Sequence, residues 1–213
     1  MKARQSGMPE EQMWKGFFDP AAILRLLNLS PSCRDVADFG CGYGTFTIPA
    51  ARVVSGTVHA FDIEPDMVGV TRAKVEAEGL RNVQVCLRDF VVEGSGLSPA
   101  SVDYVMLFNI LHAEERQVLL QEAFRILTPA GVLGIVHWNY DPTTPRGPSM
   151  DIRPRPQQCQ QWAEQAGFGL LEPGIIPLPP YHYGMALRRA ITPLSRPTFG
   201  RCPERHPQAG TRG

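Results

Sequence analysis

The chain has 213 residues and a formal net charge of zero, and its hydrophobic and charged shares are 43% and 20%. This length predicts one domain with a sizeable core. The balanced charge gives no general support for binding to nucleic acid or to a membrane surface.

The spacing of the cysteines disfavours a disulfide-rich or metal-binding protein, and the lack of long apolar runs disfavours a membrane protein. The five cysteines show no C-x-x-C spacing, so neither a disulfide framework nor a metal site is expected. No segment approaches the roughly 20 apolar residues of a membrane span, and the first residues lack the apolar core of a signal peptide. We therefore expect a cytoplasmic protein.

Strand-like and helix-like segments alternate through the first two thirds of the chain. Residues 1–16 are polar and are expected to be flexible, and Asp19-Pro20 is typical of a helix start. The following segments are expected to be strands: 35–38, 57–61, 83–87, 102–108 and 132–137. Helices are expected over 20–28, 45–54, 64–79 and 114–127, with a turn at 128–131.

The last third of the chain is less regular. Residues 140–156 form a Pro-rich loop, which is typical of a lid or a binding loop. A helix is expected over 154–166, and two final strands near 170–171 and 183–187 are joined through 177–180. Residues 191–213 read as a disordered tail.

The alternation predicts an α/β domain over residues 17–190, a doubly wound, mostly parallel sheet with helices on both faces. In such sheets ligands bind at the carboxyl ends of the strands. The polar residues of interest follow strands at that edge: the glycine loop, Asp62, Asp89, Asn109 and His137.

The segment Asp38-Phe-Gly-Cys-Gly-Tyr-Gly44 joins the first strand to the next helix. Its three glycines, Gly40, Gly42 and Gly44, remove the Cβ atoms that would keep a ligand from the backbone. A second acid, Asp62, closes the next strand. This combination suits a nucleoside whose ribose hydroxyls need acceptors.

The spacing of this loop differs from the dinucleotide pattern G-x-G-x-x-G, because the third glycine comes one position early and Thr45 takes its place. The form D-x-G-x-G-x-G resembles the first motif of the class I S-adenosylmethionine-dependent methyltransferases. Further segments resemble later motifs of that family, in order: 62–67, 88–90, 102–112, 127–131 and 166–168.

This resemblance implies a seven-stranded Rossmann-like sheet with a final antiparallel strand, and S-adenosyl-L-methionine as the cofactor. Asp38 and Asn109 would lie near the methionine end, and the glycines against methionine and ribose. Asp62 would accept hydrogen bonds from the ribose hydroxyls. Asp89 would face the adenine amino group, with Phe90 and Ile63 or Met67 packing on the ring.

Residues for the methyl acceptor are harder to assign. Methyl transfer from a sulfonium is an in-line displacement that leaves a neutral thioether, so a general base is needed only for a protonated, weakly nucleophilic acceptor. The catalytic residues are unknown, and the candidates are His112, His137, Tyr181 and His182. We expect a small-molecule acceptor and no nucleic-acid or membrane partner. The oligomeric state is open.

Arginines of the Pro-rich loop suggest one acceptor feature. Arg146, Arg153 and Arg155 carry guanidinium groups that suit carboxylates and phosphates, so this loop could cover an anionic acceptor. Arginines that only solubilise a loop would look the same in the sequence.

Two other functions remain open. A non-catalytic module that binds S-adenosylmethionine or S-adenosylhomocysteine would carry the same loop and acids. A nicotinamide-dependent oxidoreductase is disfavoured by Thr45 and the early third glycine.

Overall fold

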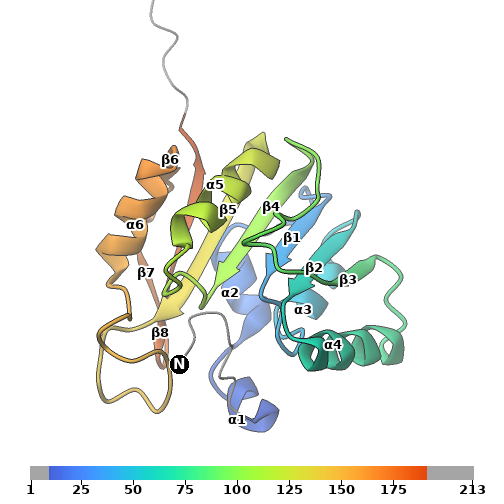
Figure 1. Cartoon of the computed structure of the whole chain (residues 1–213), viewed down its shortest axis with the longest axis horizontal. Helices are drawn as coiled ribbons and strands as arrows, with labels where there is room; N and C mark the ends of the chain where they lie inside the picture. Colours follow the sequence, from blue (N-terminus) through green and yellow to red (C-terminus); the bar gives the residue numbers. More distant parts are fainter. Residues whose placement is uncertain (1–9, 191–213) are drawn as a thin grey trace, which may run out of the picture.

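The computed structural model describes residues 10–190, which form one central sheet covered by helices on both faces (Figure 1). The strand order is β3-β2-β1-β4-β5-β8-β6, with β7 also paired to β8. The strands are β1 (Val36–Phe39), β2 (Val58–Asp62), β3 (Val83–Leu87), β4 (Val102–Phe108), β5 (Leu127–Trp138), β6 (Phe168–Leu170), β7 (Ile176–Leu178) and β8 (His182–Arg189). The helices are α1 (Glu11–Lys15), α2 (Pro20–Leu26), α3 (Thr47–Val53), α4 (Pro65–Ala77), α5 (Arg116–Ile126) and α6 (Pro156–Gln165).

Strands β1 to β5 are parallel, and β8 runs antiparallel to β5. The predicted α/β class, the mostly parallel sheet and the antiparallel final strand are therefore confirmed. Both β6 and β7 pair with the outer edge of β8, at Leu187–Arg189 and at His182–Gly184. The two strands share one position at the edge of the sheet, next to β8. The sheet therefore has the expected seven positions, although it contains eight strands.

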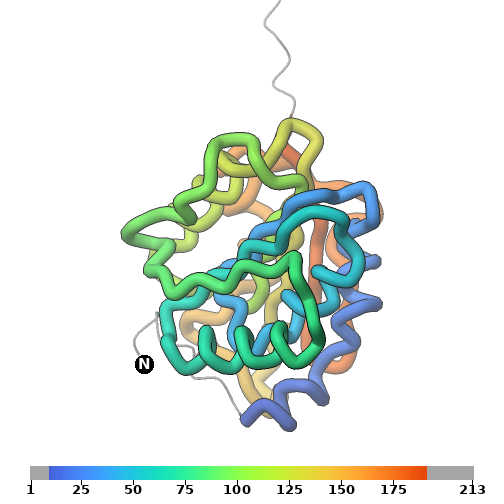
Figure 2. The backbone as a smooth tube through the Cα atoms, turned by 90° about the vertical axis from the view of Figure 1, so that its right-hand side faces the viewer, coloured from blue at the N-terminus to red at the C-terminus, as the bar shows by residue number. Residues whose placement is uncertain are grey.

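Each face of the sheet has its own apolar core, because side chains of a strand point alternately to opposite faces. On one face, α5 and α6 pack on residues such as Val105, Leu107 and Ile135. On the other, α2, α3 and α4 cover residues such as Met106, Val136 and Ala60. Figure 2, seen from the β3 edge, shows the blue α2 and the yellow-green α5 on opposite sides of the sheet.

Local sequence signals explain several boundaries. The Asp19 carboxylate accepts a hydrogen bond from the Ala22 amide at 3.0 Å, and Pro20 opens α2 as expected. Pro65 likewise occupies the first position of α4. Strands β3 and β4 have the predicted bounds, since their apolar runs are bounded by polar residues.

Two predictions about irregular segments are wrong. Residues 128–131 were expected to form a turn, but they belong to β5, where the pairing with β4 shifts between Val102 and Tyr104. The connection expected at 177–180 contains β7, because its backbone pairs with β8. Both errors arise from Pro and Gly residues, which strands tolerate at bulges and edges.

The structure includes part of the N-terminal segment and ends before the C-terminal one. Within the segment expected to be flexible, residues 1–16, the described part contains helix α1, whose Trp14 is buried. The expected disordered tail, 191–213, lies outside the described residues.

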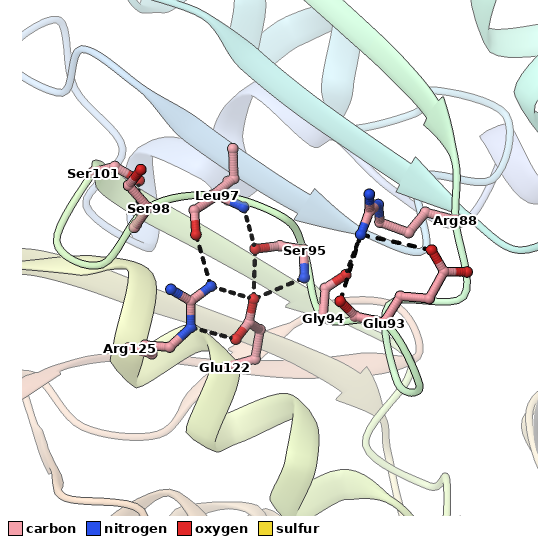
Figure 3. A network of polar contacts seen from close by, with 9 residues as sticks. All are labelled: Arg88, Glu93, Gly94, Ser95, Leu97, Ser98, Ser101, Glu122 and Arg125. Carbon is pink, nitrogen blue, oxygen red and sulfur yellow. Dashed lines mark hydrogen bonds and ion pairs between the residues drawn. The ribbon is translucent and has the colours of Figure 1, made fainter.

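A polar network fixes the connection between β3 and β4 to helix α5 (Figure 3). The Glu122 carboxylate accepts hydrogen bonds from the amide and hydroxyl of Ser95, at 2.7 and 2.5 Å, and from Arg125 at 2.7 Å. Arg125 also donates to the Leu97 carbonyl. The hydrogen bond with Arg125, followed by those with Ser95, lowers the pKa of Glu122 to about 2 although burial opposes this.

Candidate functional site

The carboxyl ends of the parallel strands point to the lower edge of Figure 1, where α1 and the loop after β5 also lie. Four of the segments singled out in the sequence meet at this edge. They are the glycine loop after β1, the residues after β2, the turn after β4 and the end of β5. This is the location expected for ligands in parallel sheets.

The glycine loop is held by backbone groups in left-handed conformations. Gly40, Gly42 and Gly44 have φ values of 77°, 53° and 73°, which favour glycine. The Gly40 amide donates to the Phe61 carbonyl, and the Gly42 carbonyl accepts from the Thr71 hydroxyl at 2.7 Å. A residue other than glycine at these positions would therefore strain the backbone.

Asp62 joins the end of β2 to this loop. One carboxylate oxygen accepts from the Gly42 amide at 2.8 Å, and the other accepts from the Glu64 amide at 3.0 Å. Burial raises the pKa of Asp62, while these backbone donors lower it. A carboxylate has about four acceptor positions, so it retains capacity for a ligand hydroxyl.

Asp38 lies beneath the loop and is buried. The Thr47 hydroxyl donates to it at 2.6 Å. Burial raises the pKa of Asp38 to about 7, although the Thr47 hydrogen bond lowers it. The negative potential of Asp62 raises it further. A cation bound nearby would favour the ionised form of Asp38.

Asn109, directly after β4, has a φ of 58°. Its side-chain nitrogen and oxygen are buried and find no hydrogen-bond partner within residues 10–190. Buried amides are normally bonded, so this side chain is available to a ligand. The next residue, Ile110, lies against Gly40: a Cβ built on that glycine would be 3.1 Å from Ile110 Cγ2.

The residues predicted to surround an adenine ring differ in burial and in packing partners. Ile63 and Met67 follow β2 and are half-buried. The Asp89 carboxylate accepts from the amides of Val91 and Val92. Phe90 is buried against Phe39, with ring centroids 5.2 Å apart, in the core on the α5 face.

Helix α1 packs against the glycine loop. Trp14 Nε1 donates to the Thr45 hydroxyl at 3.0 Å, and Lys74 Nζ lies 2.5 Å from Glu11 and 2.8 Å from the Tyr43 carbonyl. Sequence reasoning missed the roles of Lys74, Thr47 and Thr71, because their partners are distant in the chain and no local motif marks them.

The four candidate catalytic residues separate into two groups. His182 packs between the rings of Phe18 and Trp138, at 4.4 and 4.2 Å, and Tyr181 lies against Trp138. His137 is fully buried, and its Nε2 lies 3.4 Å from Nδ1 of His112. Burial lowers the pKa of His112 to about 4, of His182 to about 3, and of His137 well below its usual range. All three rings are thus neutral at pH 7.

A cavity of about 360 Å³ opens beside His112, between the turn after β4, the Pro-rich loop and α6. Arg155 of that loop lines it, as do Arg116 and Trp162. Of the four candidates, only His112 lines this cavity.

The contacts of Arg153 do not support the hypothesis that its guanidinium group binds an anionic acceptor. It is buried, and its guanidinium donates to the carbonyls of Asn139, Asp141 and Pro148. It holds the loop together, because its planar set of donors matches several backbone acceptors at once. Arg146 is exposed.

Within residues 10–190, no group of three His, Cys, Asp or Glu side chains is arranged to hold a metal ion. The same part of the chain contains no helix of the length and apolarity that a bilayer crossing requires.

Comparison with known proteins identifies the domain. The family model described as "Methyltransferase domain" matches residues 36–131, which run from β1 into β5 and include the glycine loop, Asp62 and Asn109. The matched segment is thus similar to a methyltransferase domain of the class I S-adenosylmethionine-dependent type. The cofactor of this class is S-adenosyl-L-methionine.

Curated proteins match about half of the chain. Aklanonic acid methyltransferase DauC from Streptomyces sp. (strain C5) is 35% identical over 106 residues, which are 48% of this chain and 47% of the relative. Demethylmenaquinone methyltransferase from Geobacillus stearothermophilus is 27% identical over 117 residues, 52% of this chain and 47% of the relative. The chain thus spans about half the length of these curated relatives.

Solved structures show the same fold over more of the chain. An S-adenosylmethionine-dependent methyltransferase from Aquifex aeolicus superposes with a TM-score of 0.74 at 23% identity, covering 85% of this chain and 94% of that one. The [4+2]-cyclase SpnF superposes with a TM-score of 0.69 at 14% identity, covering 88% and 84%. Since a cyclase shares the methyltransferase fold, the fold alone does not define the reaction.

Proposed function

We propose that this protein transfers a methyl group from S-adenosyl-L-methionine to a small-molecule acceptor that binds beside His112. The observation that carries the proposal is the edge formed by the glycine loop, Asp62 and Asn109. There, glycine backbone, a carboxylate with acceptor capacity and a buried amide without a protein partner within residues 10–190 converge.

These groups fit the cofactor in chemical terms. Asp62 would accept from the ribose hydroxyls while it holds the Gly42 amide. The ionised form of Asp38 would favour the cationic methionine end, and Asn109 would bond that end with its free amide. When bound, the cofactor supplies an electrophilic methyl group on a sulfonium.

The adenine ring would lie between Ile63 and Met67, both half-buried. Asp89 would face the adenine amino group. Phe90 contributes less to this contact than the motif implies, because its ring packs on Phe39 in the core. The stacking surface is therefore provided chiefly by the side of α4.

On the acceptor side, this protein would act mainly by positioning. The leaving thioether is neutral, so no oxyanion-stabilising donors are needed, and alignment of the acceptor atom can supply much of the rate. His112 would accept or donate a hydrogen bond as a neutral imidazole. Its pKa of about 4 makes it a weak base at pH 7.

Two relatives support a small acceptor by their names, since one is named for aklanonic acid and one for demethylmenaquinone. A third, 43% identical over 53 residues, is a ribosomal protein L11 methyltransferase. The cavity of about 360 Å³ favours a small-molecule acceptor over a protein acceptor, because it has the size of a small-ligand site.

Calorimetric titration with S-adenosylhomocysteine tests the cofactor half of the proposal. The wild-type protein should bind it, and Asp62→Ala should weaken binding by roughly 1–3 kcal/mol or more, because the ribose loses a charged acceptor and the loop loses its bond at Gly42. Asp66→Ala, a change at an exposed residue of α4, is the matched control. Wild-type protein that binds neither S-adenosylmethionine nor its demethylated form would refute the function. Release of S-adenosylhomocysteine in the presence of acceptors separates turnover from mere binding.

A further inference from the structure

The cavity beside His112 is lined by two guanidinium groups, each of which lies over an aromatic ring. The Arg116 guanidinium lies over the ring of Trp162 at 4.3 Å, and that of Arg155 lies over the ring of Tyr140 at 3.8 Å. All four residues line the same cavity. The two pairs come from different segments, α5 with α6 and the Pro-rich loop with the start of α6.

Neither arginine forms an ion pair with another residue of the described segment, 10–190, whereas Arg125 and Arg88 do have such partners. Arg116 makes one hydrogen bond, to the Ala113 carbonyl. Stacking on an aromatic ring restrains a guanidinium and leaves its in-plane N–H edge open to a carboxylate or phenolate.

Two acids also line the cavity. Glu114 is exposed. The hydrogen bond from the Ser149 side chain lowers the pKa of Asp151, which is fully exposed. The third cation, Arg153, is committed to backbone carbonyls of the loop. Arg116 and Arg155 are thus the cations whose donors remain open to a ligand.

The cavity adjoins the proposed cofactor site through a short turn. Ile110 lies against Gly40 of the glycine loop, and His112 follows two residues later and lines the cavity. A molecule in the cavity would therefore have one end near the methionine end of the cofactor. The aromatic rings of Tyr140 and Trp162 supply flat apolar surface.

We propose that this cavity binds a planar aromatic acid, whose anionic group is held by Arg116 and Arg155. This inference rests on the proposed function and names its acceptor class. The ligand charge is recognised by two pre-oriented guanidinium groups, and the ring system packs between aromatic side chains. A phenolate or carboxylate oxygen of the acid near His112 would be the methyl acceptor: the bond from sulfur to the methyl carbon breaks as the oxygen–carbon bond forms, S-adenosylhomocysteine leaves as a neutral thioether, and no proton is transferred.

The test uses benzoate, 1-hydroxy-2-naphthoate and anthraquinone-2-carboxylate, each with its uncharged amide, in calorimetric titrations of the full chain saturated with S-adenosylhomocysteine. At least one acid should bind ten times more tightly than its amide. The double variant Arg116→Gln, Arg155→Gln should lose that tenfold preference, and Arg146→Gln, an exposed arginine of the same loop, should keep it.

S-adenosylhomocysteine affinity is measured first for each variant, as the control for folding and for the proposed function. If the acids and amides bind equally, or if none binds at millimolar concentration to protein that binds S-adenosylhomocysteine, the aromatic-acid inference is overturned. Loss of S-adenosylhomocysteine binding in wild-type protein would instead count against the methyltransferase proposal. An acid preference retained in the double variant would place the anion site elsewhere.

Discussion

The glycine loop and the cavity beside His112 are built in opposite ways. In the loop, backbone amides and carbonyls of residues 40–44 are bonded to Asp62, Thr71 and Lys74, and positive φ values set its shape. In the cavity, side chains from distant segments meet, and two guanidiniums rest on aromatic rings. If the proposed function holds, backbone geometry would specify the cofactor, whereas side chains would specify the acceptor.

Changing the loop backbone should have the largest effect. Gly42→Val places a β-branched residue at a φ of 53° between the bonds to Asp62 and Thr71. We expect S-adenosylhomocysteine affinity to fall at least a hundredfold, equivalent to about 2.7 kcal/mol, with the circular dichroism spectrum retained. Gly69→Ala, in α4 where an added Cβ meets no atom within 4 Å, should bind normally. Tight binding by the valine variant would mean that the ligand does not approach this loop.

The next largest effect concerns pH and Asp38. Its folded-state pKa of about 7 lies above the ordinary value of 3.8, so the proton stays bound in the folded protein up to about pH 7. The affinity for cationic S-adenosylmethionine should therefore fall as pH drops from 8 to 6, by up to about tenfold per unit below the pKa. In Asp38→Asn this slope should disappear.

The same shift has a consequence for stability. Because the folded protein holds this proton more tightly than the unfolded chain, ligand-free stability decreases as pH rises from about 4 to 7. Asp38→Asn should consequently raise the melting temperature at pH 8 while weakening cofactor binding. A variant that is less stable at pH 8 would contradict the burial argument.

The rate of methyl transfer to an acceptor in the cavity should depend only weakly on pH. Burial lowers the pKa of His112 to about 4 and keeps His137 and His182 neutral. At saturating cofactor, kcat for any acceptor should show no histidine inflection between pH 6 and 8. An inflection near pH 6.5 that is lost in His112→Gln would show that this histidine titrates as an ordinary exposed one.

The smallest effects belong to the network away from both regions. Glu122→Gln should destabilise the fold by about 1–2 kcal/mol in urea titrations at pH 7, because it weakens charge-assisted bonds from Arg125 and Ser95. The pKa of Glu122 is lowered from 4.5 to about 2, so this stabilisation is present above pH 4.5 and is lost as pH falls toward 2.

Glu93→Gln, which removes an exposed ion pair with Arg88 at 3.7 Å, should change stability by less than about 0.5 kcal/mol. Neither the Glu122 nor the Glu93 variant should alter cofactor affinity. Equal destabilisation by the two would contradict the role assigned to the Glu122 network.

Much of the fold could be predicted because apolar runs and turn residues are local signals. Strands β3 and β4 were predicted with their bounds, and the final antiparallel strand followed from the resemblance. The split of one edge strand into β6 and β7 could not be predicted, since it depends on pairing with β8. Helix α1 was missed because its sequence is polar and its packing rests on Trp14.

The sequence predicted the part of the candidate site that is formed by backbone and by residues at strand ends. The positions of Gly40 to Gly44 and of Asp62 follow from strand ends. Side-chain roles were harder to predict: one hypothesis gave Arg153 an anionic acceptor and the other gave it only solvent, but it donates to loop carbonyls. The pairing of Arg116 with Trp162 joins two helices, and no local pattern reveals it.

Hydrogen–deuterium exchange with and without S-adenosylhomocysteine tests the central claim most directly, because it locates the ligand on the chain. We expect slower exchange in residues 40–47, 62–67 and 109–112, with little change in the Glu122 network. Binding without protection of the glycine loop and of the residues after β2, or protection confined to other segments, would contradict it.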